Sequence, residues 1–411
     1  MSVEDPITRR RFIGTTAAGV AALGATKLGV PATGQVLGAN DRLNIGVIGC
    51  GGMGTGHLRR LVERSAKPEE KLKIVAVCDV YEPRKERAKA ISGAEVFHHY
   101  RGLLDMPDLD AVLIATPDHW HAQMSIDALE AGKDVYCEKP VTLYWQEAKQ
   151  VAETVKRTGR VFQCGVQSTS DDLWWQANRL IREGALGKLI WSQSGYCRNS
   201  RGGEWNWGID PGCSPANLDW DLWLGPAPKR PFDPERYFRF RKYWDYSGGV
   251  ATDLLFHALG HMAVALGPEF PASVSADGGI YVQHDREVPD TYHTTIRYPS
   301  GHTVVLASSM CNRQAWPETI RGHEATMTFE GPGLVIRPED EYKQNRQELQ
   351  ARPEPRADHQ TNWLECIRTR ERPHCNADVA YRVCVAIALG IESYRTGRTM
   401  KFDPVREEVV S

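Results

Sequence analysis

The 411-residue chain lacks a strong charge of either sign. Its 50 Lys and Arg nearly balance its 52 Asp and Glu, which leaves a formal net charge of −2. A nucleic-acid-binding surface needs a basic excess, so this balance argues against a nucleic-acid partner. Hydrophobic residues make up 41% of the chain and charged residues 25%. That composition is typical of a folded globular protein with two or three domains.

Long apolar runs and paired cysteines are also lacking. No uncharged run is long and apolar enough to predict a membrane span. The ten Cys include no C-x-x-C pair and no zinc-ribbon spacing. Several of them end apolar runs, which is typical of buried free thiols: Cys50, Cys78 and Cys137. A disulfide among the last three, Cys366, Cys375 and Cys384, stays open.

The first residues of the chain resemble an export signal. "TRRRFIG", at residues 8–14, precedes a weakly apolar stretch rich in Ala and Gly. A basic segment, a short apolar segment and small residues form a signal-peptide pattern, and Arg9–Arg10 resembles the twin-arginine type. We therefore expect residues 1–39 to direct export, for example to the periplasm. Cleavage would follow Ala32 or Ala39, and an uncleaved tail is the alternative.

"LNIGVIGCGGMG" places a short apolar strand directly before a glycine-rich loop, and a helical pattern follows. Strand, loop and helix in this order are the context in which G-x-G-x-x-G binds a dinucleotide. Gly49 permits the tight turn, Gly51 lets the backbone approach the pyrophosphate, and Gly54 lets the helix pack closely. The free N–H groups at the start of the helix, near Gly52 and Met53, would bind the phosphates.

An acidic residue ends the second predicted strand. "KLKIVAVCD" closes on Asp79, 25 residues after Gly54, where a carboxylate accepts hydrogen bonds from the adenosine ribose. The carboxylate would repel a 2′-phosphate, so NAD is the expected cofactor. Arg84, five residues further on, keeps NADP open. The alternative role of Asp79 is to cap the helix that follows.

Strand and helix patterns alternate over the first third of the chain. Further strands are expected over residues 109–117, 133–140 and 160–167, with helices over 118–132 and 142–159. This alternation predicts an α/β fold with a parallel, doubly wound sheet, a Rossmann domain over residues 40–165. Ligands bind such sheets at the carboxyl ends of the strands. The candidate cofactor contacts near those ends are Thr116, Pro117, His119, His121, Glu138, Lys139 and Gln167.

"CEKP", at the end of a predicted strand, resembles a motif of the Gfo/Idh/MocA family, which includes glucose–fructose oxidoreductase and inositol dehydrogenase. "GGVATDLLFHALGH" resembles the family's Gly-Gly…Asp-x-x-x-His segment, and "LDWDLWLGPAP" and the C-terminal tail extend the likeness. The resemblance implies an NAD(P)-dependent oxidoreductase that acts on CH–OH groups of carbohydrates. It also implies a second domain over residues 166–411, with an open, mainly antiparallel sheet that often mediates homo-oligomers. C-terminal helices can pack back on the first domain.

The resemblance assigns catalytic roles to three residues. Lys139 would contact the substrate hydroxyl and the nicotinamide ribose, His257 would transfer the proton, and Asp253 would bind substrate or orient the other two. The chemistry agrees, because an imidazole suits proton transfer near neutral pH and a cationic Lys stabilises a developing alkoxide. Residues four apart on a helix share a face, so Asp253 and His257 can converge. The alternatives are a solvated Lys139 and a half-buried, structural His257.

His261 continues the spacing of Asp253 and His257 by one more helical turn. Three such residues on one helix face could form part of a metal site. The family's alcohol-dehydrogenase chemistry needs no metal, and we expect none here.

Aromatic and polar residues are mixed between residues 192 and 246. Aromatic faces and polar side chains suit a sugar ring, whose C–H faces pack on aromatics and whose hydroxyls need partners. The candidate substrate contacts are Arg198, Trp205, Asn206 and Trp207, whereas Trp220 and Trp223 look structural. Alternating apolar and polar residues then predict strands over 272–282, 290–299, 302–310 and 318–331.

Three functions fit these observations. The favoured one is an exported oxidoreductase that moves a hydride to or from a ring hydroxyl of a sugar, sugar acid or cyclitol. The second is redox-neutral glycoside cleavage by oxidation, elimination and re-reduction with tightly bound NAD, in which His261 or Tyr196 would be the second base. The third, a non-catalytic sugar sensor, is disfavoured by the set of Lys139, Asp253 and His257.

Overall fold

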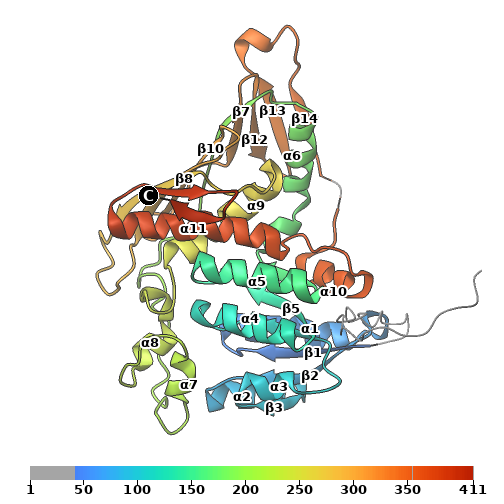
Figure 1. Cartoon of the computed structure of the whole chain (residues 1–411), viewed down its shortest axis with the longest axis vertical. Helices are drawn as coiled ribbons and strands as arrows, with labels where there is room; N and C mark the ends of the chain where they lie inside the picture. Colours follow the sequence, from blue (N-terminus) through green and yellow to red (C-terminus); the bar gives the residue numbers. More distant parts are fainter. Residues whose placement is uncertain (1–41, 354, 411) are drawn as a thin grey trace, which may run out of the picture. The chain divides into compact units, whose positions relative to one another are not determined.

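Two β-sheets organise the residues that this computed structural model describes, 42–353 and 355–410 (Figure 1). The expected signal segment lies outside the described residues. The first sheet has six parallel strands in the order β3-β2-β1-β4-β5-β6. Its strands are β1 (Leu43–Ile48), β2 (Leu72–Cys78), β3 (Glu95–Phe97), β4 (Ala111–Ile114), β5 (Asp134–Glu138) and β6 (Phe162–Gly165). The predicted doubly wound sheet is therefore confirmed.

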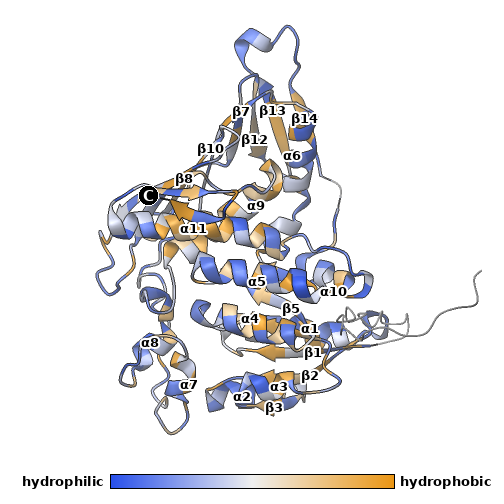
Figure 2. Cartoon of the chain, viewed as in Figure 1, coloured by the Kyte–Doolittle hydropathy of each residue, from blue (hydrophilic) through white to orange (hydrophobic). Residues whose placement is uncertain are grey.

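Helices cover both faces of the parallel sheet, because its strands are apolar on both sides. Ile45 and Val47 of β1 pack on one face and Ile48 on the other. Figure 2 shows the hydrophobic strands between helices with more polar outer sides. One face is covered by α3 (Tyr100–Leu104), α4 (His121–Glu130) and α5 (Trp145–Thr158), and the other by α1 (Gly52–Ser65) and α2 (Glu82–Ser92).

The chain returns to the first domain near its C-terminal end. Helix α10 (His359–Thr369) adds Trp363, Leu364 and Ile367 to the core that β1 and α1 share. Helix α11 (Ala377–Thr396) joins the core on the other face, beside α5 (Figure 1). The core around the nucleotide-binding sheet is thus completed by helices that begin about 200 positions after β6, the last strand of that sheet.

The second sheet has ten strands in the order β14-β13-β12-β11-β7-β10-β9-β8-β15-β16, of which only the β7–β10 pair is parallel among the described residues. This mixed, mainly antiparallel sheet agrees with the expected fold of the second domain. The predicted strand over 318–331 is two strands, β11 and β12, because the chain turns at His323–Glu324. The strands are β7 (Leu189–Gly195), β8 (Ser273–Gly279), β9 (Thr291–Arg297), β10 (Thr303–Ser309), β11 (Thr319–Gly322), β12 (Ala325–Glu330), β13 (Gly333–Pro338), β14 (Leu349–Ala351), β15 (Met400–Asp403) and β16 (Glu408–Val410).

One face of the second sheet packs against helices α6 (Asp172–Arg182), α9 (Phe256–Leu266) and α11. The opposite face carries more exposed side chains, among them Trp191, whose ring stacks on Arg321 with the guanidinium 3.8 Å from the ring centroid. No described helix is long and apolar enough to span a bilayer. All ten cysteines are free and seven are buried, so the disulfide left open among the last three is not formed.

A long excursion separates β7 from α9. It contains α7 (Trp220–Leu224) and α8 (Pro234–Phe238), which build a small aromatic core of their own with Tyr81 from the first domain. The excursion ends in a π-helical turn, Ala251–Leu255, that leads directly into α9. π-turns are rare and often lie at functional sites, and this one carries Asp253. The short 3₁₀ segments are Pro68–Glu70, Asp118–Trp120, Gln167–Ser170, Phe240–Lys242 and Asp340–Tyr342.

Candidate active site

The glycine-rich loop has the geometry that a dinucleotide requires. Gly49 has φ +87°, and a Cβ there would lie 2.6 Å from the Ala115 carbonyl oxygen. A Cβ on Gly54 would lie 1.8 Å from the Gly49 carbonyl oxygen, which leaves no room for any other residue. Helix α1 begins at Gly52, so its first N–H groups are free to bind phosphate. The loop residues therefore fit an NAD diphosphate.

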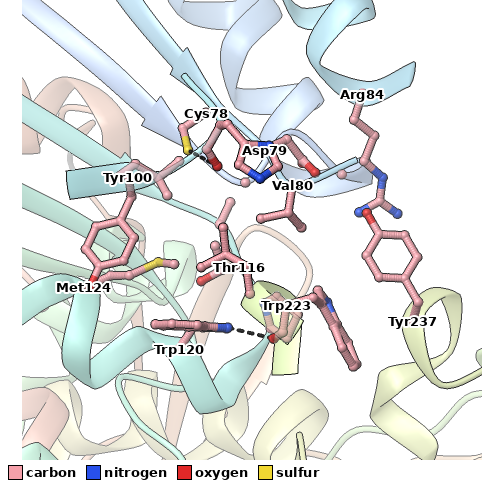
Figure 3. A pocket seen from close by; sticks show the side chains of 17 residues that line it. Cys78, Asp79, Val80, Arg84, Tyr100, Thr116, Trp120, Met124, Trp223 and Tyr237 are labelled. Atoms are coloured by element: carbon pink, nitrogen blue, oxygen red, sulfur yellow. Dashed lines mark hydrogen bonds between the residues drawn. The ribbon is translucent and has the colours of Figure 1, made fainter. Parts of the chain in front are cut away.

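A pocket opens beside this loop at the carboxyl ends of β1, β2 and β4 (Figure 3). Asp79, Arg84 and Thr116 line it from the first domain, and Trp223 and Tyr237 line it from the excursion. The Thr116 hydroxyl is buried without a hydrogen-bond partner, as expected of a group that waits for a ligand. The position after the second strand makes this the adenosine end of the dinucleotide site.

Asp79 is held by the backbone rather than by a cation. Its Oδ2 accepts a hydrogen bond from the Cys50 N–H at 2.7 Å, and its Oδ1 accepts one from the Tyr81 N–H at 3.0 Å. Each carboxylate oxygen has a second lone pair, so both can still accept a ribose hydroxyl. Arg84 lies against the Tyr237 ring, with the guanidinium carbon 4.6 Å from its centroid. This geometry agrees with the expectation, based on Asp79, that the cofactor is NAD.

The excursion covers the adenosine pocket as a roof, which we define as residues 210–238. Tyr81 and Leu218 form an antiparallel β-bridge, and the Tyr81 hydroxyl donates to Asp210 at 2.6 Å. The Trp120 indole N–H donates to the Trp223 carbonyl at 2.8 Å (Figure 3). The sequence suggested a structural role for Trp223, but its side chain also lines the pocket.

A second cleft continues from the loop toward the second domain, and Lys139 lines it. The Lys139 Nζ donates to Asp253 Oδ1 at 2.6 Å and to the Asp253 carbonyl at 3.0 Å. Both side chains are buried. An ammonium has three N–H donors, so one remains for a substrate oxygen. Lys139 from β5 and Asp253 from the π-turn thus meet as the family resemblance implied.

Asp253 remains ionised because cations surround it. Burial raises its pKa, but Lys139 and Arg241 outweigh burial and hold the pKa far below its usual range. The Arg241 Nε donates to Oδ1 at 2.8 Å, and the Trp205 indole donates to Oδ2 at 3.2 Å. The carboxylate therefore organises donors from both domains.

His257 lies one turn beyond Asp253, and its side chain makes no hydrogen bond with the described residues. Its ring centroid is 6.3 Å from that of Tyr196. Burial, together with the positive charge of Lys139, lowers the pKa of His257 to about 3. The imidazole is therefore neutral at working pH and free to accept a proton.

Glu138 stands behind Lys139 in a buried polar cluster. Its Oε1 lies 2.7 Å from His57 Nε2 and accepts from the Gln167 amide at 3.1 Å. Burial raises the pKa of Glu138, but the His57 hydrogen bond and charge outweigh it, so the pKa is lowered. Glu138 lines the cleft, whereas Gln167 contacts Glu138 and the Tyr136 hydroxyl.

His119 and His121 differ from their expected role as cofactor contacts. Both rings are buried and bind backbone carbonyls: His119 Nε2 lies 3.2 Å from the Trp223 oxygen. His121 lies between the carbonyl oxygens of Thr116 and Pro140, at 2.9 and 2.6 Å. Neither side chain lines the two cavities described above. His121 instead joins the loops that carry Thr116 and Lys139, and His119 joins the segment after Thr116 to Trp223.

The expected substrate contacts divide into three kinds. Trp205 is buried and donates to Asp253, so its indole N–H is not free for a ligand. Asn206 is half-buried, and its amide N–H groups donate to Gly202 and Asp285. Trp207 is half exposed and lines the cleft. Arg198 Nη1 lies 4.0 Å from Asp253 Oδ2.

Trp205 is also the one large aromatic residue with positive φ among the described residues, at +64°. A bulky residue in that conformation is strained, and such strain persists only where the surroundings hold it. Here the strain aims the indole N–H at Asp253.

His261 does not complete a metal site with Asp253 and His257. Its ring stacks on Trp174, at a centroid distance of 4.0 Å, and its two nitrogens face Ser168 and Glu318. Among the residues that the structure describes, no cluster of three or more His, Cys, Asp or Glu could hold a metal ion.

The sequence pattern did not indicate Arg241 or Tyr237 as residues that line the clefts, whereas Arg84, which keeps NADP open, does line them. Arg241 lies in "RYFRFRKYWDYSGG", a segment recognised only as mixed polar and aromatic. The one available signal was its position twelve residues before Asp253, and that spacing has no periodic meaning.

Models of one protein family match both halves of the chain. The NAD-binding Rossmann fold of the oxidoreductase family matches residues 43–166, and the family's C-terminal alpha/beta domain matches residues 178–411. The parallel sheet with its glycine loop and the mixed sheet behind it define an NAD-dependent oxidoreductase. The chain belongs to the Gfo/Idh/MocA family, as its motifs implied.

Individual relatives agree with this membership. The chain is similar to the scyllo-inositol 2-dehydrogenase (NAD(+)) of Bacillus subtilis, with 27% identity over 88% of this chain and 96% of the relative. It is 30% identical to a glycosyl hydrolase family 109 protein of Shewanella woodyi, over 39% of this chain and 35% of that one. Its fold is similar to that of levoglucosan dehydrogenase in complex with NADH and levoglucosan, with a TM-score of 0.68, 20% identity, and coverage of 88% and 99%.

Proposed function

We propose that the chain transfers a hydride between NAD and a ring hydroxyl of a sugar, sugar acid or cyclitol. The observation that carries this proposal is the hydrogen bond from Lys139, which lines the cofactor cleft, to Asp253. His257 lies one helical turn beyond Asp253, and its side chain has no hydrogen-bond partner among the described residues. Two similar proteins support the substrate class, since they are a scyllo-inositol 2-dehydrogenase and a levoglucosan dehydrogenase.

Each of the three side chains has a separate task. His257 takes the hydroxyl proton, since burial and Lys139 lower its pKa and keep the imidazole neutral before the reaction. Lys139 stabilises the developing alkoxide with its free N–H, and Asp253 holds the Lys139 ammonium in place. When bound, NAD accepts the hydride from the ring carbon or returns it.

The test is steady-state formation of NADH from a panel of inositols, sugars and sugar acids. We expect His257→Asn to lower kcat by roughly 100-fold or more, which is typical of a general base, while NAD binding persists. Full turnover by this variant would refute the assignment. NAD and sugar binding without any turnover by the unaltered chain would favour the sensor.

We propose in addition that residues 1–39 direct export by the twin-arginine route and that the protein assembles as a homo-oligomer. The motif around Arg9–Arg10 supports export, and the open second sheet supports assembly. Fractionation of cells that express the chain, with Arg9 and Arg10 both changed to Lys as a control, tests export. Sedimentation of the purified protein tests assembly.

A second candidate function is redox-neutral glycoside cleavage with retained NAD. The roof over residues 210–238 favours it, because hydrogen bonds from Tyr81 and Trp120 hold the roof over the adenosine end. The likeness to a glycosyl hydrolase family 109 protein supports it as well. A cofactor held in this way could accept a hydride and return it within one turnover.

The discriminating measurement is the nucleotide content of the purified protein. Stoichiometric NAD released on denaturation, with aglycone release from a glycoside when no NAD is added, would support cleavage. Tyr81→Phe removes one roof hydrogen bond and is expected to raise the NAD dissociation rate by about 5- to 10-fold. A protein that is purified without NAD and binds and releases it freely would favour the dehydrogenase function instead.

A further inference from the structure

Three cationic side chains meet a single carboxylate beside His257. Lys139 and Arg241 bind Asp253 Oδ1 at 2.6 and 2.8 Å, and Arg198 Nη1 lies 4.0 Å from Oδ2. Asp253 is the one described carboxylate in direct contact with these cations, whereas Glu138, Asp118 and Glu204 act on them from further away. A cation without a directly bonded counter-charge favours an anionic ligand, because charge-assisted hydrogen bonds are strong.

The other carboxylates of the cleft act on Lys139 and Arg241 through space only and form no direct ion pair with them. Glu138 is bound by His57 and Gln167, and Asp118 accepts hydrogen bonds from the hydroxyls of Ser247 and Thr252. Within the described part of the chain, neither carboxylate lies within 4.0 Å of a charged nitrogen of Lys139, Arg198 or Arg241.

Both guanidinium groups keep donors that face no partner. Arg241 uses only its Nε, and Nη1 and Nη2 donate to none of the described residues. Its plane is held over the rings of Trp207 and Phe240, at 5.3 and 4.6 Å. Arg198 donates one Nη2 hydrogen bond to the Tyr196 hydroxyl, and its side chain is 38% exposed. Tyr196 in turn lies against His257, which places Arg198 beside the proton acceptor.

A carboxylate suits these donors better than a neutral hydroxyl does. A guanidinium presents parallel N–H groups that match both oxygens of a carboxylate, and such charge-assisted hydrogen bonds are stronger than neutral ones. We propose that the substrate is a sugar acid, whose carboxylate is bound by Arg198 and Arg241. This proposal rests on the proposed function, since it places the carboxylate next to Asp253, close to the reacting hydroxyl.

The cofactor diphosphate is a second source of anionic oxygens for Arg241. Gly51, Gly52 and Arg241 line one cleft, so a nitrogen of Arg241 could serve either ligand. Arg198 distinguishes the two sources, because it lies on the Tyr196 and His257 side of Asp253 and does not line that cleft.

Matched sugars test the proposal on the full chain loaded with NAD. D-glucuronate is compared with D-glucose, and D-galacturonate with D-galactose, by calorimetric titration and by NADH formation. At least one acid is expected to bind roughly 10- to 100-fold more tightly than its neutral counterpart. Equal or tighter binding of both neutral sugars would overturn the proposal, and so would the absence of binding by both acids.

Substitutions then locate the carboxylate. Arg198→Gln is expected to lower the ratio of acid affinity to neutral-sugar affinity about 10-fold. Arg198→Lys should lower it by less, because Lys keeps the positive charge but lacks the parallel N–H donors of a guanidinium. Arg201→Gln is the matched control, since Arg201 lies three residues further on, is exposed and makes no interaction with the described residues. An unchanged ratio in Arg198→Gln, with unfolding temperature and NAD affinity preserved, would overturn the proposal.

Arg241→Gln separates substrate from cofactor. Loss of acid preference with unchanged NAD affinity in the absence of sugar supports a carboxylate contact. Weakened NAD binding with an unchanged acid preference would assign Arg241 to the diphosphate and overturn its part of the proposal. The two proposals fail differently: acids that bind without NADH formation refute the hydride transfer, whereas efficient turnover of neutral sugars alone refutes the carboxylate subsite.

Discussion

The Nζ atom of Lys139 lies 2.6 Å from Oδ1 of Asp253, and this contact joins the end of β5 to the π-turn before α9. The two residues are 114 positions apart in the chain. Neither domain alone contains the pair, so its geometry depends on how the two domains pack. The same contact fixes the one free N–H of Lys139 that can reach a substrate.

Removal of the Lys139 ammonium should reduce turnover more than it reduces stability. Lys139→Met keeps the length of the side chain, and Asp253 retains Arg241 as a charged partner. We expect kcat/KM to fall roughly 100- to 1,000-fold, as is typical when one electrostatic donor to the transition state is lost. Steady-state NADH formation measures the change. A kcat/KM within about threefold of the unaltered chain would contradict the proposed role.

Asp253→Asn should behave in the opposite way. It leaves Lys139 and Arg241 buried without a counter-charge, and breaking a buried pair from one side typically costs about 3–5 kcal/mol. Urea unfolding should therefore show a larger loss of stability for Asp253→Asn than for Lys139→Met. Equal losses would contradict the role of Asp253 as the counter-charge that Lys139 and Arg241 need.

The low pKa of His257 predicts an unusual pH profile. Burial and Lys139 lower that pKa to about 3, so His257 stays neutral from neutral pH down to well below the ordinary His range. The acid limb of kcat/KM should therefore lie far below pH 6.5, the ordinary His pKa. An acid limb near that value, lost in His257→Asn, would show that the imidazole titrates as an exposed one.

His121 predicts a loss of stability at alkaline pH. Burial lowers its pKa, but the neighbouring Cys137 and Asp118 and the Pro140 carbonyl outweigh burial and raise the pKa to about 9. Carbonyl oxygens on both ring nitrogens require two N–H groups, hence a protonated ring. Because the folded-state pKa exceeds the unfolded value, the stabilisation is complete below about pH 6.5 and is lost as pH rises through about 9.

Urea unfolding at a series of pH values measures this contribution. The free energy of unfolding should fall by up to about 3 kcal/mol between roughly pH 6.5 and pH 9.5 in the unaltered chain. His121→Asn should remove that slope. A slope that is the same in both proteins would place the alkaline titration elsewhere.

Two glycines of helix α1 provide a matched pair. Gly54→Ala would force a Cβ to within 1.8 Å of the Gly49 oxygen, whereas a Cβ on Gly56 meets nothing within 4 Å. Gly54→Ala should therefore distort the loop and weaken NAD binding by at least about 10-fold, and Gly56→Ala should add about 0.5–1 kcal/mol of stability. Calorimetric titration with NAD and urea unfolding test both. Equal NAD affinity in the two variants would contradict the loop geometry.

The sequence predicted those parts of the protein in which local pattern and fold agree. Alternating strands and helices and the Gly49–Gly54 loop follow from short-range periodicity and turn chemistry, and the structure has both. The meeting of Lys139 and Asp253 came from the family resemblance, since no local rule relates residues so far apart. The structure confirms that they meet, and their catalytic roles stay predictions.

The excursion could not be predicted in the same way. The position of Trp205 against Asp253 depends on a strained backbone angle, and that of Tyr237 on an aromatic cluster shared with Tyr81. Such contacts join irregular segments, which carry no periodic signal. For the same reason His119 and His121 were expected to face the cofactor: proximity to a strand end is visible in the sequence, but the direction of a ring is not.

Helix α10 has a consequence for the order in which the protein is made. Trp363 and its neighbours fill a core that β1 and α1 begin, although the ribosome adds them some 300 residues later. Until then, Leu43, Ile45 and Leu58 lack part of their apolar cover. The core of the first half of the chain therefore stays incompletely packed until the last part is synthesised. A fragment cut at the boundary between the two family models would expose this surface.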